Sequence, residues 1–264
     1  MRTIFRSILQ KPFTWLQLSS FGFRLSLRIR YGATGPHGYP DAPWYNAVLK
    51  NQKEANRAIT QVHKLGLPLM KFPPKNWDSL AALDLVLKST GKDGRIFDAG
   101  GELYSMILPW LFLYGYKNLS AGNLVFHKST HKGPIVYHHS DITKTGLDNA
   151  AYDAITCLSV IEHGVNLRSY FCEMSRILKP GGVLITSTDY FDTQVDTRGQ
   201  MAYGVPIHIF TKQEIVEALE IANQFGLALI GPLDLSAEEK VVNWKQYDLN
   251  YSYVIFSLRK MASI

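Results

Sequence analysis

The segment IFDAGGELYS, residues 96–105, constrains the fold most, because it combines a buried strand with a glycine turn. Asp98 lies at the carboxyl end of this strand, and Gly100 and Gly101 follow it. In an open α/β sheet, ligands bind beyond the carboxyl ends of the strands. A glycine turn there lets backbone N–H groups and the next helix N-terminus approach the ligand closely. The segment therefore predicts a cofactor site.

Strand and helix patterns alternate along the rest of the chain. Apolar residues at spacings of three and four predict a helix over 167–178, and a capping-box pattern at Thr211 and Glu214 begins another that ends at Gly226. Two earlier helices are expected over 45–65 and after a cap at Asn76. Such alternation predicts a doubly wound, mostly parallel α/β sheet. Its further strands are expected in NLSAGNLVF, IVYHHSD, YDAITCLSVIEH, VLITSTDY, LALIGPL and YSYVIFSLRK.

Four segments, in this order, resemble the class I S-adenosylmethionine-dependent methyltransferases, and within them the small-molecule group that includes the ubiquinone-biosynthesis type. They are IFDAGG, SDIT at 140–143, YDAITCLSVIEH at 152–163 and MSRILKPGGVLITSTDYF at 174–191. A weaker fifth match is HIFTKQEIVEALEIANQFG at 208–226. The resemblance covers about residues 95–260. It implies a Rossmann-like sheet of seven strands, in which the last strand is antiparallel and inserted beside the sixth.

The resemblance also implies a binding site for S-adenosylmethionine. The turn after the first strand would face the methionine part of the cofactor, the end of the second strand its ribose, and Asp141 its adenine amino group. Ser159, at the end of the fourth strand, would line the adenosine and the methyl group. The residues carried over are Asp98, Ala99, Gly100, Gly101, Asn123, Leu124, Asp141, Ile142 and Ser159.

Two departures from the family pattern leave an alternative open. Glu102 and Tyr104 stand where the family has further glycines, and Asn123 stands where it usually has an acid on the ribose. An asparagine carbonyl still accepts a hydrogen bond, but without charge assistance. The alternative to an enzyme is therefore a binding or scaffold protein that kept the fold and lost turnover. A nicotinamide dehydrogenase ranks third, since the chain lacks G-x-G-x-x-G.

The methyl acceptor is expected to be a small molecule or glycan, methylated on oxygen. Its proton would pass to a base near the ends of the fourth and fifth strands, and the candidates are His163, Asp189 and His208. A long loop follows the fifth strand, and Tyr190, Arg198 and Tyr203 in this region are the candidate acceptor-binding residues. The histidines at 127, 131, 138 and 139 lack a metal-site pattern, so no metal is expected.

The N-terminal segment has a charge of its own. Residues 1–40 contain six of the 28 basic residues and none of the 22 acidic ones, so they account for the whole net charge of +6. We assign residues 1–75 to a basic extension, linker and cap helices, and residues 76–264 to the methyltransferase domain. Three interpretations of the basic segment remain open. It forms a cap over an anionic substrate, a peripheral membrane contact through residues 1–30, or a packed extension with exposed arginines.

Other features limit the location and partners of the protein. Cys157 and Cys172 do not form a disulfide framework, which indicates a reducing compartment, and we expect the cytoplasm. The most apolar stretch, MILPWLFLY, is too short for a membrane span. Nucleic acid is not an expected partner, because basic and acidic residues balance beyond the N-terminal segment. The oligomeric state is not determined by the sequence.

Overall fold

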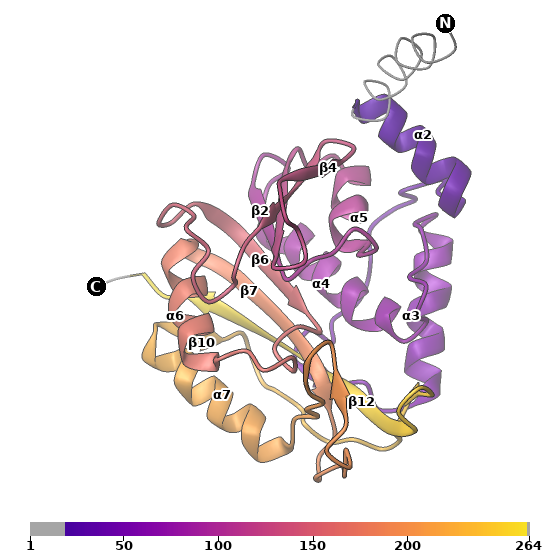
Figure 1. Cartoon of the computed structure of the whole chain (residues 1–264). Coiled ribbons are helices and arrows are strands. Elements are labelled where there is room, and N and C mark those ends of the chain that lie inside the picture. The colour runs from indigo at the N-terminus through magenta and orange to yellow at the C-terminus, as the bar shows by residue number, and fades with distance from the viewer. Residues whose placement is uncertain (1–18, 263–264) are drawn as a thin grey trace, which may run out of the picture.

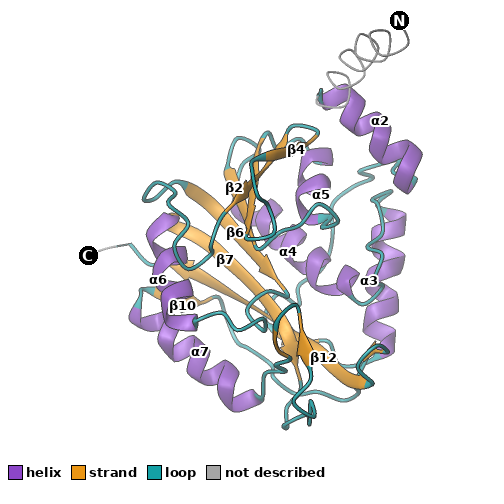
Figure 2. Cartoon of the chain, in the orientation of Figure 1, coloured by secondary structure: helices purple, strands orange, loops and turns teal. Residues whose placement is uncertain are grey.

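The computed structural model describes residues 19–262 of the 264-residue chain, as one large sheet between two layers of helices (Figures 1 and 2). The helices are α2 (Ser20–Tyr31), α3 (Gln52–Lys64), α4 (Lys75–Ser89), α5 (Ile107–Leu113), α6 (Leu167–Ile177) and α7 (Lys212–Gln224). None of these described helices is long and apolar enough to cross a membrane.

Among the described residues, ten strands form the main sheet. They are β1 (Ala47–Val48), β2 (Arg95–Ala99), β3 (Asn118–Asn123), β4 (Thr130–Lys132), β5 (Ile135–His139), β6 (Tyr152–Leu158), β7 (Leu178–Tyr190), β10 (Leu227–Leu229), β11 (Val242–Trp244) and β12 (Leu249–Lys260). A separate hairpin pairs β8 (Met201–Ala202) with β9 (Val205–Pro206).

The centre of the sheet is parallel, in the order β5, β3, β2, β6, β7. The last strand, β12, runs antiparallel to β7 and lies between β7 and β10. This is the insertion that the resemblance implied, so the predicted Rossmann-like fold is confirmed. The short strands β1, β4 and β11 are additions to it.

The outer edge of β12 is covered by three short strands in turn. β11 pairs with its beginning, β1 with its middle and β10 with its end. An uncovered edge of this length would present unpaired N–H and C=O groups. The part of the chain before α3 therefore contributes a strand to the sheet through β1. Just before this strand, Trp44 stacks on Trp77 of α4 with ring centroids 6.3 Å apart.

Both faces of the sheet are buried under helices. Because side chains alternate along each strand, neighbouring residues belong to opposite cores. Ile96 and Ala154 join the core under α3, α4 and α5, whereas Phe97 and Ile155 join the core under α6 and α7. The two helical layers lie on opposite sides of the strands in Figure 2. The apolar runs of the sequence are therefore explained by a sheet covered on both faces.

Two local expectations were wrong at the N-terminal side. Residues 45–65 do not form one helix: β1 comes first, and α3 begins at Gln52 after an N-cap at Asn51. Asn76 is not the cap of α4, which begins one residue before it. Its side chain instead closes the preceding loop, accepting from the Met70 N–H at 3.0 Å and donating to the Pro73 carbonyl at 2.8 Å. The capping box of Thr211 and Glu214 on α7 is confirmed.

Asn46 provides a test of how the part of the chain before α3 is attached. Its buried amide donates to the Ile230 carbonyl and accepts from the Ser257 N–H at 2.7 Å, which ties the segment to the β12 edge. We expect Asn46→Ala to lower the free energy of unfolding by about 2 kcal/mol, because the buried Ser257 N–H and the half-buried Ile230 carbonyl lose their partner. Urea unfolding measures this. Asn243→Ala, at an exposed asparagine on β11, is the control. Equal effects of the two changes on the free energy of unfolding would contradict this role of Asn46.

Candidate cofactor and acceptor site

A cavity of about 940 Å³ lies at the carboxyl ends of the parallel strands. Residues that follow β2, β3, β5, β6 and β7 line it, together with residues from the beginning of α4 and from β12. Its volume is at the upper end of the range for small-molecule sites. The fold therefore places one large cavity where an open α/β sheet binds its ligands.

The glycine turn after β2 is built around the buried carboxylate of Asp98. Thr156 donates to its Oδ1 at 2.7 Å, and Ser105 donates to its Oδ2 at 3.3 Å. A Cβ on Gly101 would lie 2.1 Å from Asp98 Oδ2, and Gly100, at φ +82°, packs against Val160. Both glycines are therefore required for this turn, since a side chain at either position would collide with its neighbours.

Burial raises the pKa of Asp98 to about 6, despite the hydrogen bonds from Thr156 and Ser105 and the charge of Lys75, which lower it. The carboxyl group therefore titrates close to neutral pH. A cationic ligand group beside it would favour the ionised form.

The segment after the glycine turn differs from the expectation. The next helix, α5, begins at Ile107, six residues after Gly101, so no helix N-terminus stands at the turn. Glu102 and Tyr104 lie in the intervening segment and both line the cavity. The Tyr104 hydroxyl donates to Glu102 Oε1 at 3.3 Å. Glu102, which stands where the family has a glycine, is therefore a residue of the cavity wall.

Asn123, at the end of β3, has a local role that an acid could not take. Its Nδ2 donates to the Gly100 carbonyl at 2.6 Å, and its Oδ1 accepts from the Val125 N–H at 3.1 Å. A carboxylate has no N–H to donate to that carbonyl. The asparagine therefore links the end of β3 to the glycine turn, and its carbonyl oxygen keeps one lone pair for a ligand.

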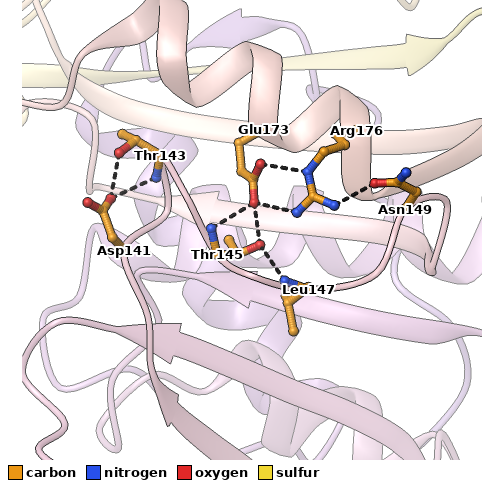
Figure 3. Close-up of polar contacts among 7 residues, drawn as sticks. All are labelled: Asp141, Thr143, Thr145, Leu147, Asn149, Glu173 and Arg176. Carbon is orange, nitrogen blue, oxygen red and sulfur yellow. Dashed lines mark hydrogen bonds and ion pairs between the residues drawn. The ribbon is translucent and has the colours of Figure 1, made fainter.

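Asp141 follows β5 and has one carboxylate oxygen engaged in the loop (Figure 3). Its Oδ1 accepts from the Thr143 N–H at 2.8 Å and from the Thr143 hydroxyl at 2.7 Å. The second oxygen has no partner among residues 19–262 and is available to a ligand. Beside it, the buried Ser140 hydroxyl also lacks a partner within the described part of the chain, and it lines the cavity.

The loop after Asp141 is held in place by an ion pair on α6. Glu173 accepts from the Thr145 N–H at 2.7 Å and pairs with Arg176, whose guanidinium contacts it at 2.7 and 2.8 Å (Figure 3). The hydrogen bonds from Arg176 lower the pKa of Glu173 to about 2.

Ser159, at the end of β6, adopts a left-handed backbone conformation with φ +55°, which residues other than glycine rarely take. Its N–H donates to the Ser187 carbonyl at 2.9 Å, and its hydroxyl contacts Lys75 Nζ at 2.7 Å. Lys75 comes from the first turn of α4 and forms a buried ion pair with Asp78. Helix α4 therefore fixes the backbone conformation at the end of β6.

Two further carboxyl groups face the cavity from the ends of neighbouring strands. Asp189 lies near the end of β7, Glu162 follows β6, and both are buried. Burial raises the pKa of Asp189 well above its usual value, and the charge of Glu162 raises it further. The Tyr251 side chain lowers the pKa of Asp189, and the Thr188 hydroxyl donates to Glu162 at 2.9 Å.

Aromatic rings complete this side of the cavity. Tyr251 and Tyr253 share one face of β12, and the Lys75 ammonium lies 4.6 Å from the centroid of the Tyr253 ring. Tyr203, in the long loop after β7, is 82% exposed and contacts the ring of His163 with centroids 5.2 Å apart. His163 and Tyr203 therefore lie at the cavity, as the sequence predicted, although neither is buried.

Four of the predicted site residues do not line the cavity. Ala99 is buried within the core at the end of β2. The Tyr190 side chain is buried on the face of the sheet toward α6 and α7, where its hydroxyl donates to the Leu235 carbonyl at 2.7 Å. Arg198 donates to the Tyr247 carbonyl at 2.7 Å and pairs with Asp248, so it holds the turn before β12. His208 contacts Glu214 at 3.2 Å, near the start of α7.

The structure adds residues that the sequence analysis did not place in the site. Lys75, Glu162, Tyr251 and Tyr253 line the cavity, and the buried Asp78 is the ion-pair partner of Lys75. The signal for the tyrosines is their alternation along the last strand, which puts both on one face. Glu162 is adjacent to His163 in the sequence. Nothing local in the sequence distinguishes Lys75 and Asp78 from an ordinary surface ion pair on a helix.

Comparisons with known proteins agree with this geometry. The profile of the methyltransferase domain family matches residues 117–186. A methyltransferase from Mesorhizobium loti, described as S-adenosylmethionine dependent, has a TM-score of 0.50 and 17% identity, over 69% of this chain and 97% of its own. Geranyl diphosphate C-methyltransferase from Streptomyces coelicolor has a TM-score of 0.51 and 16% identity, over 89% of this chain and 93% of its own. No curated protein sequence matched the chain.

The chain has the class I methyltransferase fold. The resemblance to class I S-adenosylmethionine-dependent methyltransferases is confirmed, and the family match and the fold together support an S-adenosylmethionine-dependent methyltransferase. The residues present fit this cofactor: eight of the nine predicted contacts line one cavity, and Asp98, Asp141 and Ser140 offer it polar groups. Glycines at 100 and 101 keep the turn free of side chains.

Asp98 gives the first test of the cofactor site. We expect Asp98→Asn to weaken S-adenosylmethionine binding tenfold or more, since a hydrogen bond to a charged group contributes about 1.5–3 kcal/mol. Binding by wild-type protein should also weaken as the pH falls through 6, because protonation removes the charge of the carboxylate. Calorimetric titration on both sides of that pH measures both effects. Asp93→Asn, at an exposed residue just before β2, is the control. S-adenosylmethionine binding that is independent of pH and unchanged in Asp98→Asn would contradict a role of Asp98 in the cofactor site.

Glu173 gives a second test, on stability. Its pKa is depressed in the folded state, so its contribution is complete above the unfolded pKa of about 4.5 and is lost as the pH falls toward 2. We expect Glu173→Gln to lower the free energy of unfolding by about 1–3 kcal/mol at neutral pH. This difference in stability from wild type should disappear as the pH falls through that range. Thermal unfolding at several pH values measures this. Glu217→Gln, exposed on α7, is expected to change little. A difference that persists at low pH would exclude the ion pair as its cause.

Proposed function

We propose that the protein transfers a methyl group from S-adenosylmethionine to a hydroxyl oxygen of a small-molecule or glycan acceptor. The observation that carries this proposal is the single cavity that joins the cofactor residues after β2, β3 and β5 to the carboxyl groups of Glu162 and Asp189. When bound, S-adenosylmethionine supplies an electrophilic methyl group on its sulfonium. The protein must hold the acceptor in line and take its proton.

Asp189 is the best candidate to accept that proton. A carboxylate is a stronger base when its pKa is raised, and burial together with the charge of Glu162 raises the pKa of Asp189 well above its usual value. Tyr251 also lines the cavity, and its side chain partly offsets the rise in the pKa of Asp189. His163, the leading candidate from the sequence, lies at the same cavity but is only half-buried. It ranks second because Asp189 is buried and carries a raised pKa.

The acceptor end of the cavity is suited to a hydroxylated molecule. Aromatic rings of Tyr203, Trp244 and Tyr251 line it beside the carboxyl groups, and they offer both flat apolar faces and hydrogen bonds. A strongly anionic acceptor, such as the geranyl diphosphate named for the Streptomyces enzyme, would face the buried carboxyl groups. Arg198, which the sequence suggested as an anion-binding group, is engaged outside the cavity. Within residues 19–262 no cluster of three or more potential metal ligands occurs.

A binding or scaffold protein without turnover is the second candidate. The observation that favours it is Glu102, which lines the cavity at a position where the family has a glycine. We place either function in the cytoplasm, supported by the cysteines at 157 and 172, which are both free.

Binding and turnover distinguish these candidates. Titration with S-adenosylmethionine and S-adenosylhomocysteine tests the cofactor site. Transfer of a labelled methyl group to panels of sugars, phenols and amines then tests the reaction. Transfer to sugars or phenols supports the proposal, whereas transfer to amines alone would replace oxygen by nitrogen as the target. Cofactor binding without transfer to any panel would support the scaffold, and folded protein that binds neither ligand would overturn the methyltransferase assignment.

Asp189→Asn tests the proposed base once an acceptor is found. We expect turnover to fall about a hundredfold, because general-base catalysis contributes that much or more, while cofactor affinity stays within a few-fold. The variant should be at least as stable as wild type, because it removes a buried carboxyl group whose ionised form is disfavoured. Steady-state kinetics and thermal unfolding measure these effects, with Asp192→Asn in the loop after β7 as the control. Turnover close to wild type would remove Asp189 from the mechanism.

A further inference from the structure

Helix α2 is attached to the domain by one of its faces. Phe23 and Leu27 are buried in the core, and the Phe23 ring packs on Phe112 of α5 with centroids 5.0 Å apart. Phe23 also fills the space beside Gly133, in the turn between β4 and β5, where a Cβ would lie 2.1 Å from the ring. Figure 1 shows α2 at the outer side of the α5 layer, away from α6 and α7.

The opposite face of α2 carries large apolar side chains in solvent. Phe21 is 71% exposed, Leu25 41% and Ile29 74%. A spacing of four residues places them in one stripe along the helix. The stripe has no apolar partner among the described residues, which is unusual for three large side chains in a row.

Basic residues flank this stripe. Arg24 and Arg28 are exposed and lie along the same side of the helix, one turn apart. Residues 1–40 contain no acidic residue, whereas basic and acidic residues balance over the rest of the chain. Positive charge is therefore concentrated on the segment that also exposes the apolar stripe.

We propose that α2 docks the protein on the surface of an anionic phospholipid bilayer. A helix that has an apolar stripe beside arginines lies in the plane of the interface, with its apolar side chains among the acyl chains and its arginines at the headgroups. Each arginine near an anionic surface strengthens this binding. A second copy of the chain fits less well, because two such faces would bring like charges together. This proposal concerns a surface outside the cavity and does not depend on the proposed function.

Docking through α2 would also hold the segment after the glycine turn near the bilayer. Lys132, at the end of β4, lies over the ring of Tyr31 in α2 and donates to the Leu103 carbonyl at 2.6 Å. Leu103 and Tyr104 are exposed apolar residues in the segment after the glycine turn. The contact through Lys132 therefore connects the docking helix to the rim of the cavity.

Co-sedimentation of the full chain with vesicles tests the proposal. We expect binding to phosphatidylcholine vesicles that contain roughly one third phosphatidylglycerol, weak binding to phosphatidylcholine alone, and loss of binding at high salt. The double variant Phe21→Ser/Ile29→Ser should bind at least tenfold more weakly, and Arg28→Glu several-fold more weakly. S-adenosylmethionine affinity should not change in either variant, since α2 does not line the cavity.

Matched controls lie on α7, which is on the other side of the sheet. Val216→Ser removes a partly exposed apolar side chain, and Lys212→Glu reverses an exposed charge. Neither change should alter vesicle binding. The proposal is overturned if anionic vesicles do not bind folded protein, or if the α2 and α7 variants behave alike. It is also overturned if sedimentation velocity shows a dimer in solution that Phe21→Ser/Ile29→Ser dissociates, since the stripe would then be an interface between copies.

Discussion

The ammonium group of Lys75 is the charge on which the interior of the site depends. It lines the cavity, forms an ion pair with the buried Asp78, and lowers the pKa of Asp98, Glu162 and Asp189, which burial raises. Buried carboxylates without a compensating cation would cost several kcal/mol each. The first turn of α4 therefore has to stand over the ends of β6 and β7, and this position in turn determines the shape of the cavity.

Hydrogen bonds from a neighbouring strand explain how the glycine turn can depart from the family pattern and still form a pocket. Asn123 donates to the Gly100 carbonyl, so the end of β3 supports the turn through an amide where the family usually has an acid. The segment after the turn is free of helical structure up to Ile107, which lets Glu102 face the cavity. Polar contacts from neighbouring strands thus perform the positioning that a helix N-terminus performs in the usual turn.

Sequence reasoning failed where the direction of a side chain depends on distant partners. Tyr190 and Asp189 are neighbours on one strand, so they point to opposite faces, and only Asp189 reaches the cavity. Arg198 is satisfied by backbone carbonyls of a turn about fifty residues away, and His208 by Glu214. Asn76 has the residue type of a cap but serves a loop instead. In each case the local pattern was compatible with two roles, and long-range contacts selected one.

The sequence by itself determined the alternating elements, the order of the motifs and hence the parallel sheet with its cofactor edge, because these follow from apolar periodicity and from glycines that no other residue can replace. It also determined the segregation of positive charge in residues 1–40. Tertiary structure decided which charges meet. Lys75, Asp78, Glu162 and Asp189 come from three separate segments, and the raised pKa values of Glu162 and Asp189 depend on a burial that exists only when α4 closes over the strand ends. Electrostatic interactions between such residues depend on distance in space, which sequence separation does not encode.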